Sequence, residues 1–282
     1  MRSRPVNTLT RFLPGEVARM VESDIAGSLR AGRDQPKRAS AERLGDASAQ
    51  IAALDEKMPG LGARRAALDI LMLLRRGRTL DTALSDCRTF RVLEGADRAF
   101  AFNLVSTTLR RRGSLDEIIG KYLDRPLPKN SSEVQDILRL ATCQIVLLET
   151  PAHAAVGTAV ELAAGKRETA GYKGLVNAIT RKISRQGPAL LEKLPPRSDT
   201  PGWLWRAWER QYGRAQTAAI AAVHQLPAPL DITARNAADA APLLELDGAQ
   251  SLAPGHVRLS GQPAVTELPG FGDGGWWVQD IA

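Results

Sequence analysis

Apolar residues recur at helical spacing between residues 61 and 187, and no segment there alternates with the period of a strand. The segment ARRAALDILMLLRR shows the pattern most clearly, because its apolar residues fall at positions i, i+3, i+4 and i+7 of one face. That face comprises Ala67, Ile70, Leu71 and Leu74. A long run of such segments with short connections predicts a mainly α fold, built as an all-helical bundle.

Signals for helix ends divide this region into seven predicted helices. Ser114 and Glu117, and again Ser132 and Gln135, have the spacing of a capping box, in which each side chain bonds the other residue's backbone N–H. Pro151 stops the helix before it, since proline removes a backbone donor and clashes with the preceding turn.

The sequence changes in character on both sides of the helical region, which divides the chain into four predicted parts. Residues 1–57 are polar, so we expect a disordered or weakly helical extension that buries no core. Residues 58–187 are the helical domain, and residues 188–202 are a Pro-rich linker. Residues 203–282 begin with one short helix, WLWRAWERQYG, and continue as a small α+β module. Its predicted strands are APLDITARN, HVRLSG and PAVTEL, around the helix AADAAPLLELDG.

Composition excludes several classes of protein. No apolar run reaches the roughly 18 residues of a membrane span, and the first 20 residues lack the apolar core of a secretory signal. Cys87 and Cys143 are far apart and the three histidines are scattered. We therefore expect no disulfide framework, no metal site, no membrane partner and a cytoplasmic location.

Positive charge is concentrated in the middle of the chain. Residues 58–187 carry 21 Lys and Arg against 13 Asp and Glu, a net charge of +8. Residues 1–57 carry 10 against 8, a net +2, and residues 188–282 carry 7 against 10, a net −3. Clustered cations favour a polyanionic partner, because phosphate contacts release counterions. A well-solvated surface without a partner is the alternative interpretation.

No catalytic constellation is evident. Cys143 lies inside an apolar helix, which predicts a buried structural thiol, and Cys87 is interpreted as an incidental cysteine on the surface side of a helix end, although Arg88 beside it favours a thiolate. No Ser-His-Asp order and no paired carboxylates occur. The glycines at 270, 272 and 275 spell G-x-G-x-x-G, but no βαβ unit surrounds them, so we expect a loop and no cofactor site.

Basic helix ends are the strongest functional signal from the residues themselves. Arginines can pair with phosphates and stack on bases, whereas the triplet at 110–112 can also simply complement a helix dipole. The predicted RNA-binding cations are Arg64, Arg65, Arg110, Arg111, Arg112, Lys173, Arg181, Lys182 and Arg185.

Three blocks of the helical region resemble a known family. The blocks DRAFAFNLVSTTLRRRGSLDEIIGKYLDRPLP, ILRLATCQIVLLETPAHAAVGTAVELA and KGLVNAITRK look like the NusB-like domain, an all-helical RNA-binding fold. This domain also forms the N-terminal part of RsmB-type (Sun/Fmu) ribosomal RNA cytosine-5 methyltransferases. The later segments PGWLWRAWERQYG, PLDITARN and GFGDGGWWVQDIA are similar to blocks of the methyltransferases, which stand-alone NusB lacks. The resemblance covers about residues 61–282.

The resemblance implies an RNA partner, 16S rRNA, for the helical domain. It adds Asn177 to the RNA-binding candidates and singles out Arg64 and Arg65, while Asn177 can alternatively tie helix ends together. In the family, the VQD segment leads into the domain that binds S-adenosylmethionine and carries two catalytic cysteines, in Pro-Cys and Thr-Cys motifs. Thr142-Cys143 does not match them, because it lies within the helical domain.

The resemblance therefore implies that this chain is the RNA-recognition part of such an enzyme, truncated before the methyltransferase domain. We expect no activity from the chain alone, and we expect Trp276 and Trp277 to pack against the missing domain. Two alternatives stay open: a stand-alone NusB-like antitermination or regulatory protein that binds RNA, and a helical scaffold with no RNA role.

Overall fold

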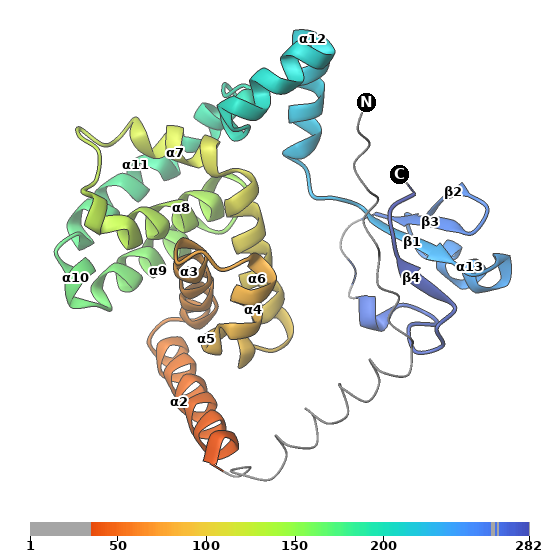
Figure 1. Cartoon of the computed structure of the whole chain (residues 1–282). Helices are drawn as coiled ribbons and strands as arrows, with labels where there is room; N and C mark the ends of the chain where they lie inside the picture. The colour runs from red at the N-terminus through yellow and green to blue at the C-terminus, as the bar shows by residue number, and fades with distance from the viewer. Residues whose placement is uncertain (1–34, 261–262, 264, 282) are drawn as a thin grey trace, which may run out of the picture. The chain divides into compact units, whose positions relative to one another are not determined.

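The computed structural model describes residues 35–260, 263 and 265–281 and divides the chain into two compact units, Met1–Phe102 and Asn103–Ala282. The helices of the first unit are α2 (Gln35–Lys57), α3 (Leu61–Arg75), α4 (Leu80–Asp86), α5 (Arg88–Arg91) and the first half of α6 (Gly95–Arg110) (Figure 1). The division falls inside α6, so the four predicted parts stay a prediction.

Helix α2 packs against α3 and α5. Ala47 and Ile51, four residues apart on one side of α2, are buried, and Asp55 accepts a hydrogen bond from the backbone N–H of Gly62 (2.8 Å). The expectation that residues 1–57 bury no core is wrong for this helix, because two apolar residues at i, i+4 spacing are enough to make one buried stripe. Residues 1–34 lie outside the described residues.

The second unit is also rich in helices, which confirms the mainly α fold. Its helices are the rest of α6, α7 (Arg112–Gly120), α8 (Ser132–Val146), α9 (Ala152–Ala164), α10 (Arg167–Ala170), α11 (Lys173–Leu191) and α12 (Gly202–His224), with 3₁₀ turns η1 (Lys129–Ser131) and η2 (Pro196–Asp199). Helices α8, α9 and α11 pack on one another. Neither predicted capping box forms, because α7 and α8 begin earlier than expected and take up Ser114 and Ser132.

An ion network joins α7 to α8. Arg139 is buried and donates to Asp116 on α7 (2.7 Å) and to Asp136 one turn away (2.9 Å). Burial alone would lower the pKa of Arg139, but its hydrogen bonds to the two carboxylates outweigh that effect and raise it.

The predicted linker, residues 188–202, is held against the bundle by one carboxylate. Helix α11 continues through Pro188 to Leu191, and η2 then places Asp199 at the start of α7. Asp199 accepts hydrogen bonds from the Ser114 backbone N–H (2.7 Å), the Ser114 hydroxyl (2.6 Å) and the Arg111 guanidinium (2.8 Å). The Gln225 side chain, which follows α12, donates a fourth bond (2.9 Å). An acidic side chain at a helix start also interacts favourably with the helix dipole.

Helix α12 is a hairpin of two helices. Gly213 has φ 76° and ψ 167°, a conformation open to glycine, and breaks the helix at that point. The arms meet where the edge of the Trp208 ring contacts His224, with ring centroids 5.1 Å apart. The predicted short helix is thus only the first arm.

The C-terminal module is a four-stranded antiparallel sheet with one helix. Its elements are β1 (Leu230–Ala234), α13 (Ala237–Leu244), β2 (Gln250–Ala253), β3 (His256–Leu259), a 3₁₀ turn η3 (Val265–Glu267) and β4 (Trp276–Val278). The strand order is β2-β3-β1-β4. The predicted strand PAVTEL is wrong, since this segment contains η3. A helical turn brings Val265 and Leu268, three residues apart, onto the same hydrophobic cluster.

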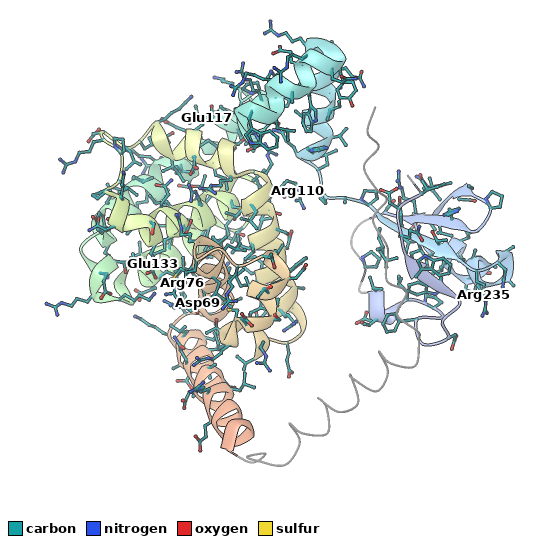
Figure 2. The ribbon with its side chains drawn as sticks, viewed as in Figure 1. Asp69, Arg76, Arg110, Glu117, Glu133 and Arg235 are labelled. Atoms are coloured by element: carbon teal, nitrogen blue, oxygen red, sulfur yellow. The ribbon has the colours of Figure 1, made fainter. Side chains whose placement is uncertain are left out.

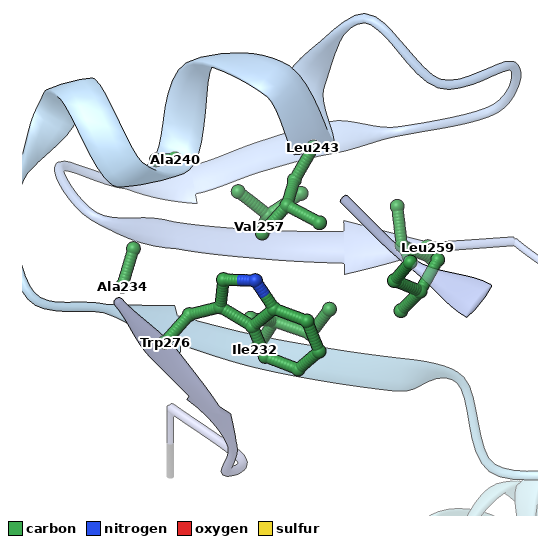
Figure 3. Close-up of a cluster of buried hydrophobic side chains, with 8 residues drawn as sticks. Ile232, Ala234, Ala240, Leu243, Val257, Leu259 and Trp276 are labelled. Carbon is green, nitrogen blue, oxygen red and sulfur yellow. The ribbon is translucent and has the colours of Figure 1, made fainter. Parts of the chain in front are cut away.

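Trp276 belongs to the core of this module. Figure 3 shows its indole beside Ile232 in a cluster that includes Val257 and Leu259, and its ring N–H donates to the Pro269 carbonyl (2.8 Å). The expectation that both tryptophans pack against another domain is therefore wrong for Trp276.

One cross-strand ion pair supports the sheet. Asp231 on β1 lies opposite Arg258 on β3, which donates to both carboxylate oxygens (2.7 and 2.6 Å). These hydrogen bonds hold the pKa of Asp231 below its ordinary value.

Two glycines of α7 provide a matched test of the docked linker. A Cβ atom at position 113 would lie 1.7 Å from the Ser198 carbonyl oxygen, whereas one at position 120 would meet nothing within 4 Å. We expect Gly113→Ala to lower the free energy of unfolding by about 1–3 kcal/mol, because backbone must move. Gly120→Ala should leave it unchanged or raise it by up to about 1 kcal/mol.

Urea unfolding followed by circular dichroism measures both variants, and limited proteolysis between residues 192 and 201 reports release of the linker. Equal stability and equal cleavage for the two variants would contradict the docking of η2 on α7.

Candidate nucleic-acid interface

The exposed side of α11 is a row of cations. The helix sequence KGLVNAITRKISRQGPALL contains no acidic residue. Its cations are Lys173, Arg181, Lys182 and Arg185, and all of them are exposed. Three of them and Asn177 recur every fourth residue, so they form a line along the helix with a spacing of about 6 Å. Lys182 lies beside this line. Within the described residues, these cations have no carboxylate partner.

The buried side of the same helix fixes the direction of this row. Val176, Ile179 and Ile183 are buried, and α11 packs there against α8 and α9. Gly187 lies so close that a Cβ atom would come within 2.8 Å of both Ile183 and Val146. Each fully buried apolar side chain contributes about 1.5–3 kcal/mol, so rotation of α11 about its axis would be costly.

Asn177 positions one of the cations. Its side-chain oxygen accepts a hydrogen bond from Nε of Arg181 (3.1 Å), one turn further along α11. This contact lies within one helix, which favours a role in orienting the guanidinium group rather than in tying helix ends together.

The arginine triplet at the junction of α6 and α7 divides into different environments. Arg111 is largely buried in its ion pair with Asp199, whereas Arg112 is exposed and only 3.9 Å from Asp116. Arg110 is half-buried at the end of α6 (Figure 2). We therefore assign Arg111 a structural role and keep Arg110 and Arg112 as candidates for RNA binding.

The two arginines of the first predicted helix point into the first unit. Arg64 is 8% exposed, donates to the Gly60 carbonyl (2.8 Å) and lies with its guanidinium 4.6 Å from the centre of the Phe100 ring. Burial lowers its pKa, although nearby carboxylates oppose the shift. Arg65 pairs with Asp69 (2.7 Å). Both side chains make contacts within the first unit, so we exclude them from the proposed RNA surface.

The first unit has other exposed cations, which are not among the RNA-binding residues predicted from the sequence. Arg76 and Arg78 end the α3 region, and Arg88 and Arg91 lie on α5. Arg88 and Arg91 were missed as candidates, because α5 is a single turn with no recognisable periodicity. Arg76, which follows the last residue of α3, is labelled in Figure 2.

Neither cysteine has the lowered thiol pKa that a catalytic nucleophile needs. Burial raises the pKa of Cys143 to about 12 and also raises that of Cys87. The prediction of a buried structural Cys143 is confirmed, and the surface assignment of Cys87 is wrong, because Cys87 lies inside the first unit against Thr89 (3.2 Å).

The glycine loop does not fit a nucleotide cofactor. It leads into strand β4 and not into a helix, so no row of helix N-terminal N–H groups faces it. Gly275 is pressed against Asp239, where a Cβ atom would be 2.9 Å from the carboxylate carbon. The residues described here also contain no cluster of potential metal ligands, and none of their helices is long and apolar enough to cross a membrane.

Comparison with known families identifies the helical region. The NusB family matches residues 61–185. This stretch is a NusB-family domain. The match includes the arginine triplet and α11 as far as Arg185, while α12 and the sheet lie beyond it. A solved structure shares the fold: the crystal structure of PH0851 superimposes with a TM-score of 0.53 at 17% identity, over 80% of this chain and 54% of that one.

Similarity to curated proteins extends past the NusB-family domain. The chain is 32% identical over 247 residues to the probable ribosomal RNA small subunit methyltransferase B of Synechocystis, covering 79% of this chain and 54% of the relative. It is 30% identical over 234 residues to ribosomal RNA small subunit methyltransferase B of Xanthomonas campestris, covering 78% and 51%. The chain thus spans about half the length of these relatives, and the predicted family resemblance is confirmed.

Thiol alkylation tests the assignment of both cysteines as structural. At pH 8 a thiol with a pKa of about 12 is ionised in roughly one molecule in 10⁴, and both thiols are also shielded from reagent. We expect iodoacetamide to leave the native chain unmodified and to modify both cysteines in urea, as measured by mass spectrometry. Rapid labelling of Cys87 in the native chain would contradict its placement.

Proposed function

We propose that this chain binds RNA and acts as the N-terminal rRNA-recognition part of an S-adenosylmethionine-dependent 16S rRNA cytosine-5 methyltransferase. The observation that carries the proposal is the cationic row of α11, held outward on a NusB-family domain. Relatives over more than three quarters of the chain are small-subunit rRNA methyltransferases, which supports rRNA as the ligand.

The binding mode follows from the geometry of α11. Four cations lie on the exposed side of α11, which has no acidic residue, and present positive potential along about 18 Å of the helix. Each Lys or Arg that neutralises a phosphate releases counterions, so the affinity depends strongly on salt. The oriented guanidinium of Arg181 can pair with a phosphate through two donors. Arg110 and Arg112 are the proposed additional contacts.

We derive no methyl-transfer step for the described residues. Neither buried cysteine provides a thiolate, and the glycine loop does not fit the cofactor. The part proposed for this chain is to bind and orient the RNA on which a complete enzyme acts.

A stand-alone NusB-like regulator is the second candidate, and the match of the helical domain favours it equally. The α12 hairpin and the sheet favour the methyltransferase assignment, because the similarity to those relatives covers more of the chain than the NusB-family domain does.

Removing two cations from α11 tests the proposed RNA surface. We expect the double variant Lys182→Ala/Arg185→Ala to bind a 16S rRNA fragment roughly tenfold more weakly at 0.1 M salt, because two phosphate contacts are lost. The slope of log affinity against log salt should decrease by about 1.4–1.8. Filter binding over a range of salt concentrations measures both quantities.

Arg43→Ala/Arg235→Ala is the matched control, since it removes the same charge from two exposed arginines outside residues 61–185. Equal weakening by the two double variants would show that only net charge matters. That result would contradict a localised surface on α11.

A further inference from the structure

The first arm of the α12 hairpin carries an exposed tryptophan that is followed by two cations on the same side of the helix. Trp203 is 67% exposed, and Arg206 and Arg210 follow it at i+3 and i+7, on the same side of the helix. Both arginines are exposed. The acidic residue of this arm, Glu209, is partly buried and lies about 120° around the helix from Trp203.

The other two tryptophans of this arm are used within the fold. Trp205 is 5% exposed, and the guanidinium of Arg197 lies 5.4 Å from its ring centre. Trp208 packs its ring against His224 and so joins the two arms of the hairpin. Trp203 contributes to neither contact, so the folding of the hairpin does not account for an indole at this position.

Arg206 and Arg210 are equally unused by the fold. Neither makes an ion pair or a side-chain hydrogen bond with any residue that the structure describes. By contrast, Arg197 in η2, four residues before Pro201, covers the buried Trp205 ring.

We propose that Trp203, Arg206 and Arg210 form a second RNA contact, which stacks an unpaired nucleobase on the indole and binds the flanking phosphates through the two guanidinium groups. The identity of the partner as RNA rests on the proposed function, but the site lies outside the NusB-family domain and selects a different feature of the ligand. Stacking on an exposed aromatic ring needs a free base face, which a paired base within a duplex does not offer.

The charges on this face favour nucleic acid over a protein partner. A protein that covered Trp203 would have to desolvate two arginines or supply carboxylates for both, which is costly. A single-stranded polyanion supplies a π-face and phosphates along one chain, so it satisfies the ring and both cations together.

Binding of short RNAs to the whole chain tests the proposal. The probes are a fluorescently labelled decamer of uridine and an RNA duplex of the same length, followed by anisotropy. We expect Trp203→Ala to weaken binding of the single strand by at least about fivefold, because one base stack is lost. Its affinity for the duplex should stay unchanged.

Two further variants separate stacking from a general loss of structure. Trp203→Phe retains an aromatic face, so it should bind the decamer more tightly than Trp203→Ala does. Arg206→Ala/Arg210→Ala should lower the salt slope for the decamer by about 1.4. Trp277→Ala is the matched control, since it removes a tryptophan that is 48% exposed on the sheet module, and we expect wild-type binding.

The outcomes distinguish this site from the proposed function. If Lys182→Ala/Arg185→Ala weakens binding but Trp203→Ala does not, the α12 site is wrong and the RNA function stands. Equal affinities of Trp203→Phe and Trp203→Ala also overturn stacking. A change in sedimentation of Trp203→Ala with unchanged RNA binding assigns this face to a protein contact and overturns the proposal. Absence of RNA binding by the wild-type chain contradicts both.

Discussion

The packing of α11 against α8 and α9 determines which residues of α11 are exposed to solvent. Val176, Ile179 and Ile183 fill the interior, so the residues opposite them must project outward, and these are the cations. Because no acidic residue interrupts the helix, the exposed side has one sign of charge along its length. A contact that stabilises the fold thereby also determines the electrostatics of the proposed RNA surface.

The carboxylate of Asp199 connects this bundle to the segment that follows it. By bonding Ser114 and Arg111 at the start of α7, and Gln225 after α12, it anchors both ends of the hairpin region. Gly113 allows the close backbone approach that this requires. Asp199 thus ties the segments on either side of the α12 hairpin to α7, and α11 packs against α7 as well, which suits two contacts to one RNA strand.

Periodicity predicts the helices well, because the buried sides of α3, α8 and α11 follow the 3.6-residue repeat of the sequence. It cannot tell which arginines face solvent. Arg64 and Arg111 belong to cationic clusters in the sequence, yet each is neutralised or buried by groups that only tertiary structure brings close. The roles of Asp199 and Trp276 depend on contacts with distant or looped segments, which have no local signal. For the same reason the short strands β2 and β4 are not predicted from the sequence, and the turn η3 is predicted as a strand.

Photocrosslinking tests the central claim that α11 and the first arm of α12 contact RNA. A 16S rRNA fragment carrying 4-thiouridine can be irradiated with the chain and the linked peptides identified by mass spectrometry. We predict crosslinks within residues 173–185 and 203–210, and loss of the second set in Trp203→Ala. Crosslinks confined to α5 or to the sheet module, residues 230–278, would contradict the account.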